Sequence, residues 1–268
     1  MTVYRGRLTS LELVVLWELM SDDVLPFPLT HWPTHQYEDD YYQAKKETAE
    51  RLLAILPEDS QQLWEAVVKP DIVIWAAGEA PDDETDMSAV TRVVGLRREG
   101  FAVVLVQEPG ETIERGGDIH VYETDVPGLA KAVIDQLPKV DAGRRGEIPI
   151  LSEKPDGLDY SYGSSQVLEA AESPEQRSDQ WRNARTTQLG ELKIEPGSGV
   201  HWIQDRRGYL LRWRDLADDG RYVIEPKPNP IAVPVDGSAF ERLVNQRVVE
   251  LVRRIRENRP TEREFRVV

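Results

Sequence analysis

The sequence lacks cysteine, holds only four histidines and contains no long apolar run. Without cysteine the chain can build neither a disulfide framework nor a thiolate metal site. No apolar segment approaches the roughly 20 residues that a membrane-spanning helix needs. Residues 1–7 are not followed by an apolar segment with a small-residue cleavage site, as in a signal peptide. These absences predict a cytoplasmic protein that does not insert into a membrane.

Positive charge is also scarce over most of the chain. The formal net charge is −15, of which residues 1–188 carry −17 and residues 189–268 carry +2. Binding to nucleic acid or anionic lipid depends on clustered Lys and Arg, so the acidic body excludes both as expected partners. The acidity also serves solubility, and that interpretation stays open.

Residues arranged for catalysis are missing from the sequence. His31 and His35 are four residues apart, but Pro33 between them disfavours a helical metal pair, although neighbouring carboxylates are available. There is no nucleophile elbow and no phosphate-binding glycine loop. The acidic run 82–86 lacks the glycine and terminal glutamate of a calcium-binding loop. We therefore expect no enzyme activity, no metal and no cofactor.

The periodicity of apolar residues predicts two similar series of elements. The first half has a strand at 2–8, a helix capped by Ser10, helices at 37–56 and 60–69, strands at 71–78, 89–97 and 101–107, a short strand pair after the turn at Pro109-Gly110, and a helix from Pro127. The second half has a strand at 147–151, helices at 164–171 and 174–188, strands at 191–195, 200–205, 209–216, 221–225 and 231–235, and a helix at 238–256. Alternating apolar and polar residues indicate antiparallel sheets with one face under helices, hence an α+β fold.

The matching order of the two series predicts an internally duplicated, pseudo-two-fold body, each half an antiparallel sheet backed by helices. The turn glycines fall at similar offsets, Gly100 with Gly208 and Gly110 with Gly220. Repeats bury their apolar faces against one another, so residues 1–140 and 141–258 should form one compact body. Residues 259–268 are expected to be a flexible tail. Two unrelated meanders remain the alternative.

Two features favour contact with a partner. Residues 78–88 form an acidic, small-residue insertion between two strands that is longer than a hairpin needs. Such a segment is either a solvent loop or a recognition loop that orders on binding. Trp202 and Trp213 fall in facing predicted strands, where core packing is the favoured role and partner anchoring the alternative.

Several segments in this order resemble a known family. They are Leu13-Val-Val-Leu-Trp-Glu-Leu, Val24-Leu-Pro-Phe-Pro-Leu, Gly100-Phe-Ala-Val-Val-Leu, Gln204-Asp-Arg-Arg-Gly-Tyr-Leu-Leu and Asp219-Gly-Arg-Tyr-Val-Ile. Together with the acidic-looped strand pair, this set resembles the EspG family of ESX (type VII) secretion-associated proteins. The resemblance spans roughly residues 3–257, and internal duplication is a feature of that family.

The resemblance implies a cytoplasmic, non-catalytic chaperone, monomeric or weakly dimeric. In the family, such proteins cap the apolar helical tip of the PPE subunit of PE–PPE heterodimers and direct the pair to its secretion system. The loop between the second and third strands takes part in recognition there, which implies contact roles for Asp82, Asp83, Glu84, Asp86 and Met87. The second-half sheet contributes as well, which implies roles for Trp202, Arg212 and Trp213.

The alternative from another class is an enzyme or sensor that binds a small ligand between the two halves. Carboxylates with His31 or His35 would then line a deep, polar pocket with perturbed pKa values. A chaperone should instead show a broad, shallow, partly apolar surface beside the acidic loop. A structural adaptor with another protein partner is a third possibility.

Overall fold

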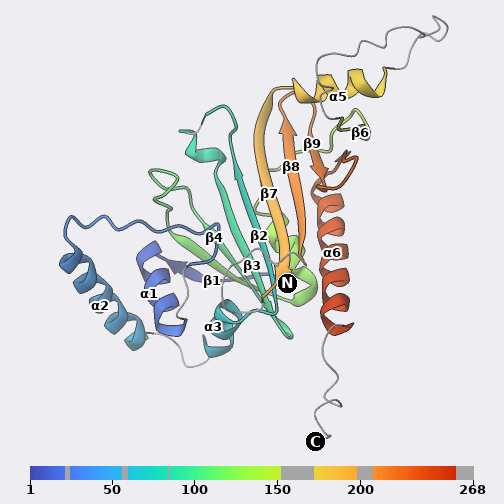
Figure 1. The fold of residues 1–268 in the computed structure, drawn as a ribbon. Coiled ribbons are helices and arrows are strands. Elements are labelled where there is room, and N and C mark those ends of the chain that lie inside the picture. The colour runs from blue at the N-terminus through green and yellow to red at the C-terminus, as the bar shows by residue number, and fades with distance from the viewer. Residues whose placement is uncertain (22–24, 56–59, 84, 152–171, 198–207, 258–268) are drawn as a thin grey trace, which may run out of the picture.

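The computed structural model describes residues 1–21, 25–55, 60–83, 85–151, 172–197 and 208–257 (Figure 1). The described strands form one 10-stranded sheet in the order β1-β5-β4-β3-β2-β7-β8-β9-β10-β6, and neighbouring strands are antiparallel. The strands are β1 Val3–Leu8, β2 Ile72–Glu79, β3 Thr91–Arg98, β4 Phe101–Gln107, β5 Ile119–Thr124, β6 Ile148–Pro149, β7 Thr186–Pro196, β8 Tyr209–Leu216, β9 Arg221–Ile224 and β10 Ile231–Pro234. The fold is therefore α+β, as predicted.

The two halves of the chain share this sheet. β2 and β7 pair at its centre, from Ile72 opposite Pro196 to Glu79 opposite Leu189. The prediction of a separate sheet in each half was wrong. The innermost strand of each half, β2 or β7, would have an unpaired edge on its own, and the two strands pair with each other instead. Read inward from either edge, the strands of a half come in the same order: first, fifth, fourth, third, second.

The predicted pairing of turn glycines does not follow this strand order. Gly100 lies in the turn between β3 and β4, whereas Gly208 directly precedes β8. The turn that corresponds to Gly100 joins β8 to β9 and contains Gly220, which has a φ of 156°. Equal sequence offsets were misleading because the connections before these turns differ in length.

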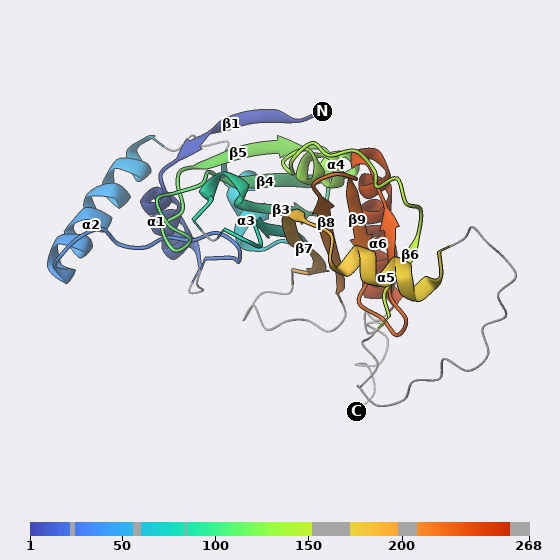
Figure 2. The same cartoon turned by 90° about the horizontal axis from the view of Figure 1, so that it is seen from above.

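Helices cover both faces of the sheet. They are α1 Ser10–Met20, α2 Glu38–Ile55, α3 Gln61–Val68, α4 Leu129–Ile134, α5 Pro174–Arg182 and α6 Gly237–Glu257, with the short 3-10 helices η2 Met87–Ala89 and η3 Val126–Gly128. Figure 2 shows the sheet curving from β1 and β5 round to β9, with α1 and α2 near one end and α5 near the other.

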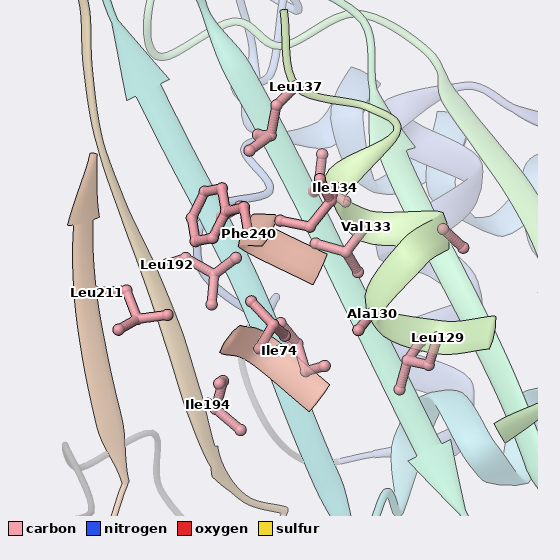
Figure 3. Close-up of a cluster of buried hydrophobic side chains, with 14 of the residues drawn as sticks. Ile74, Leu129, Ala130, Val133, Ile134, Leu137, Leu192, Ile194, Leu211 and Phe240 are labelled. Carbon is pink, nitrogen blue, oxygen red and sulfur yellow. The ribbon is translucent and has the colours of Figure 1, made fainter. Parts of the chain in front are cut away.

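The face under α4 and α6, here the α4/α6 face, holds the larger core (Figure 3). Ile74, Leu192 and Leu211 come from adjacent strands of both halves and pack with Val133 and Phe240 from the two helices. The periodicity that predicted a helix at 238–256 rests on an apolar stripe, and that stripe is confirmed because its members are buried or packed against this core: Phe240, Leu243, Val244, Val248, Leu251, Val252 and Ile255. This core spans the junction of the halves and stabilises their union.

On the opposite face, here the α1–α3 face, the helices α1, α2 and α3 cover the first half. Leu13 and Trp17 of α1, Leu52 of α2 and Trp64 of α3 pack there with the buried residues of β3, β4 and β5. α1 lies between the sheet and α2, which explains why five consecutive residues from Leu13 to Trp17 are buried.

Some predicted boundaries were wrong. Thr9 rather than Ser10 caps α1, in a capping box with Glu12. The helix expected at 174–188 ends at Arg182, and β7 begins at Thr186, earlier than predicted. The inward residues at this end of β7 are the polar Thr186 and Gln188, so apolar periodicity could not reveal the strand. The helix expected at 164–171, the strand at 200–205 and the tail at 259–268 lie outside the described residues.

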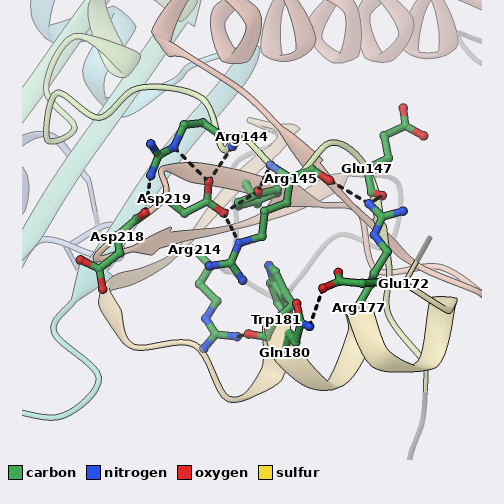
Figure 4. Close-up of polar contacts among 11 residues, drawn as sticks. Arg144, Arg145, Glu147, Glu172, Arg177, Gln180, Trp181, Arg214, Asp218 and Asp219 are labelled. Carbon is green, nitrogen blue, oxygen red and sulfur yellow. Dashed lines mark hydrogen bonds and ion pairs between the residues drawn. The ribbon is translucent and has the colours of Figure 1, made fainter. Parts of the chain in front are cut away.

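A polar network ties the connection between the halves to the β8–β9 turn (Figure 4). The buried Asp219 carboxylate accepts hydrogen bonds from the Arg144 backbone N–H at 2.6 Å and the Tyr222 hydroxyl at 2.7 Å, and pairs with Arg145 at 3.0 Å. Burial and this carboxylate raise the pKa of Tyr222 to about 12. Nearby, Arg221 and Asp215 form a buried pair with two 2.7 Å contacts.

Two glycines of the central strands make room for a tryptophan ring. Gly78 of β2 lies opposite Gly190 of β7, and the Trp213 ring packs against both. A Cβ atom on Gly190 would lie 2.0 Å from Cζ2 of Trp213. Trp213 cannot swing aside, because it is 1% exposed, packs on Phe240 and donates from Nε1 to Gln188.

We predict that Gly190→Ala lowers the free energy of unfolding by about 1–3 kcal/mol through overpacking. Gly100→Ala is the matched control, because no heavy atom lies within 4 Å of its added Cβ. Urea unfolding followed by tryptophan fluorescence measures both variants. Equal stability of Gly190→Ala and the wild type would contradict the packing described at the central strands.

Candidate partner-binding surface

The α1–α3 face continues over β7 and β8 without α1, α2 or α3 above it. Register places Leu189, Glu191, Lys193 and Arg212 on this face together with Trp75 of β2. α5 covers it only near Arg214, whose guanidinium carbon lies 4.4 Å from the centroid of the Trp181 ring. A stretch of sheet that is packed on one face therefore remains accessible on the other.

A groove of about 500 Å³ lies where this accessible sheet meets the first half. The β2–β3 connection, the β4–β5 connection and the segment after α1 border it. The first two project at the same end of the sheet (Figure 1). Its lining residues are Phe27, Pro28, Thr30, Trp75, Ala77, Gly78, Glu79, Val90, Thr91, Arg92, Ile113, Leu189, Gly190, Glu191, Arg212 and Trp213.

Apolar side chains are exposed around the groove. Phe27 is 55% exposed although it packs edge-on against Trp75, with ring centroids 4.7 Å apart. Leu189 and Ile113 are exposed to 40% and 39%. These side chains come from three separate segments and gather at one place, which is typical of an interaction surface.

The segment that carries Phe27 is fixed to the sheet by Gln107. The buried Gln107 side chain accepts a hydrogen bond from the Thr30 N–H at 2.9 Å and donates to the Thr30 carbonyl at 2.7 Å. This two-way amide contact mimics a strand pair and holds the groove wall in place.

The predicted recognition loop borders the groove. Asp82, Asp83 and Asp86 are exposed and Met87 is half-buried at the start of η2, while Glu84 lies outside the described residues. Asp83 accepts from the Thr85 hydroxyl at 2.6 Å and its N–H at 2.9 Å, and these bonds lower the pKa of Asp83. Asp86 caps η2 by accepting from the Ser88 N–H at 3.1 Å. The loop thus has internal order along much of its length.

The predicted residues of the second-half sheet have different surroundings. Arg212 lines the groove, is exposed, and pairs with Glu191 at 2.8 Å. Trp213 is 1% exposed and packs in the α4/α6 core although it also lines the groove, and its part in partner binding stays a prediction. Trp202 lies outside the described residues.

Sequence reasoning missed Arg92, Phe27 and Leu189 as groove residues. Arg92 stands in the apolar strand β3 and is 5% exposed, yet it lines the groove. The available signal was an arginine directly before the apolar stretch of β3, because charged side chains are rarely buried unless they are paired.

His31 and His35 lie away from the groove, against Tyr41 of α2. His31 is half-buried, stacks on Tyr41 with centroids 5.9 Å apart, and places Nδ1 3.0 Å from the Ser10 hydroxyl. His35 also lies against Tyr41. Within the described ranges, no three His, Asp or Glu side chains are placed to hold a metal ion. None of the described helices is both long and apolar enough to span a bilayer.

Comparison with known proteins decides the family. The sequence model of the EspG family matches residues 9–246. The chain belongs to the EspG family. No curated protein matches it. Among solved structures, it is similar to the Mycobacterium tuberculosis type VII secretion system chaperone EspG5 in complex with a PE25–PPE41 dimer. That structure is 14% identical, with a TM-score of 0.47, and the match covers 94% of this chain and 96% of that one.

Membership in the EspG family confirms the resemblance found in the sequence. The groove and its acidic loop are therefore features of an EspG chain. Any function assigned to this chain must account for the exposed apolar residues of the groove and the charged residues beside it.

Burial of His31 makes stability depend on pH. Burial lowers the pKa of His31 below 6.5. The imidazole of His31 is therefore protonated more readily in the unfolded chain than in the folded chain. The free energy of unfolding should therefore fall as pH drops from 6.5 through the folded pKa. We predict that His31→Asn reduces this loss, whereas His35→Asn, at an exposed position, leaves it unchanged. Urea unfolding at neutral and mildly acidic pH measures both, and identical pH slopes in all three proteins would contradict the assignment.

Proposed function

We propose that this chain is a non-catalytic chaperone of type VII (ESX) secretion that binds the apolar tip of a PE–PPE-type heterodimer. By covering that tip it keeps the substrate soluble and directs it to its secretion system. The observation that carries the proposal is the open groove, with exposed Phe27, Ile113 and Leu189 beside an acidic loop, on a chain of the EspG family.

The groove alone is smaller than the surface that a specific complex needs. Stable protein interfaces bury about 1,200–2,000 Å² in total. We assign the centre of the contact to the groove and its periphery to the β2–β3 loop and the open face of β7 and β8. Apolar anchors at a centre with polar residues around them are the usual anatomy of an interface.

The acidic loop has a separate part in the proposal. Asp82, Asp83, Asp86 and Met87 flank the groove without lining it, and Glu84 belongs to the same loop. Charges at the rim of an interface change association rates and partner choice more than affinity. We therefore assign the loop to selection among substrates and Arg212, at the groove itself, to direct contact.

The chemistry of the groove favours this function over a ligand-binding enzyme. Its walls are mainly apolar and come from strand ends and connections, whereas the histidines of the rival hypothesis lie elsewhere, against α1 and α2. A structural adaptor would use the same surface and differ only in its partner. We place the chaperone in the cytoplasm, as a monomer or weak homodimer.

We also propose that the two halves, residues 1–140 and 141–258, are repeats of one ancestral unit. The identical strand order from each edge of the sheet supports this. So does the helix that follows the last meander strand of each half, α4 after β5 and α6 after β10. Under this proposal the β2–β3 connection corresponds to the β7–β8 connection.

Affinity capture of the tagged chain from its host's cytosol, followed by mass spectrometry, tests the function. We predict recovery of a PE–PPE pair in equal proportions at moderate salt. The experiment uses cells shown to express such a pair. Failure to recover it from those cells would overturn the chaperone assignment and favour the adaptor or the ligand-binding hypothesis.

Variants of the groove and loop locate the contact. Leu189→Asp should weaken binding of the captured pair at least tenfold, since it places a charge among the apolar anchors. Val249→Asp is the control, because Val249 is an equally apolar, 67% exposed residue on α6, away from the groove.

Deleting residues 81–86 should weaken binding with little change in melting temperature. Unchanged binding after the deletion would remove the loop from the interface.

A further inference from the structure

Arg92 carries a buried charge that its surroundings leave incompletely satisfied. The side chain is 5% exposed, and one terminal nitrogen donates to the Ile113 carbonyl. The other, Nη1, is buried and has no hydrogen-bond partner among the residues that the structure describes. Native proteins rarely leave a buried donor unpaired, and a charged donor is the most costly case.

The neighbours of Arg92 on its own face of the sheet cannot supply the missing acceptor. Ala77, opposite on β2, has only a methyl group. Gln107, opposite on β4, has its amide bonded to Thr30 and Gly117. Glu191, on the next strand beyond Ala77, is paired with Arg212. Burial lowers the pKa of Arg92, and the exposed Glu114 acts on it only as an opposing charge.

The unpaired donor belongs to a residue that lines the groove, between the apolar Phe27, Trp75 and Leu189. A guanidinium binds carboxylates through paired, charge-assisted hydrogen bonds. Glu79 and Glu191 also line the groove, and the rim carries Asp82, Asp83 and Asp86. These negative charges repel a phosphate dianion or nucleic acid more strongly than a single carboxylate, whose one charge matches the one available cation.

We propose that Arg92 receives a single Asp or Glu side chain of the bound partner, presented among apolar residues at the tip that enters the groove. This inference rests on the proposed function and adds the chemistry by which the groove chooses its partner. An apolar tip without a correctly placed carboxylate leaves Arg92 as unsatisfied as it is in the free chain, and binds more weakly because it gains no charge-assisted hydrogen bond. A tip with the carboxylate forms an ion pair with Arg92, and each of the two charged groups gains a partner.

The first test compares Arg92→Met, Arg92→Lys and the control Arg98→Met in binding the captured PE–PPE pair. Arg98 lies on the same strand outside the groove and bonds to the Lys69 carbonyl. Arg92→Met should reduce affinity at least tenfold while its melting temperature stays equal or rises, because a poorly satisfied buried charge is removed. Arg92→Lys should retain more affinity than Arg92→Met, and Arg98→Met should match the wild type. A large fall in melting temperature with unchanged affinity would mean that Arg92 is structural, and would overturn the proposal.

The second test identifies the partner carboxylate. Each Asp and Glu near the apolar tip of the captured pair is changed to Asn or Gln. One such change should reduce affinity as much as Arg92→Met, and adding it to Arg92→Met should cause no further loss. Additive losses at every position would overturn the proposed pairing.

A third measurement does not depend on the partner, so it separates this inference from the proposed function. The side-chain NMR signals of Arg92, assigned by their loss in Arg92→Met, are followed during titration with sodium acetate. They should shift with acetate and stay unchanged with sodium chloride or acetamide. If no PE–PPE pair is captured but acetate shifts Arg92, the carboxylate site stands and the chaperone function fails. Absence of an acetate shift would overturn the site.

Discussion

The pairing of β2 with β7 is the constraint on which the rest of the structure depends. It joins ten strands into one sheet and places Ile74, Leu192 and Leu211 under the same two helices. Where Gly78 and Gly190 face each other, the Trp213 ring fills the space that side chains would need. Since both halves contribute to one core, neither can bury its apolar face without the other. The β2–β3 connection consequently starts at the junction of the halves.

The helices are distributed unequally over the two faces, and this creates the candidate partner-binding surface. α4 and α6 cover the junction on one face, whereas α1, α2 and α3 stop at the first half on the other. The uncovered part of β7 and β8 lies beside the segment around Phe27, which Gln107 holds against the sheet. A groove with apolar walls follows from this arrangement. Its single buried guanidinium adds a polar requirement to a surface that would otherwise accept many apolar partners.

Much of the fold was predictable from the sequence, because apolar periodicity reports burial. The stripe on α6 and the apolar strands β2, β3 and β4 were found for this reason. The early start of β7 was missed because Thr186 and Gln188 point inward through hydrogen bonds, which periodicity does not record. The single sheet was missed because strand pairing between halves depends on tertiary contacts. At the candidate site, the loop with Asp83 and Asp86 was visible as an insertion. Arg92 and Leu189 were not found, since their significance comes from which strands lie side by side.

The groove floor is only one peptide layer thick at Gly78 and Gly190, with the Trp213 ring directly beneath. At these two residues, only the strand backbone separates the groove from the core. Substitutions at the rim, such as in the 80–90 connection, alter what binds without reaching the core. Substitutions at Gly78 or Gly190 change the groove and the core at once. Across related chains, partner preference should therefore diversify by rim changes, while the two glycines and the indole change only together.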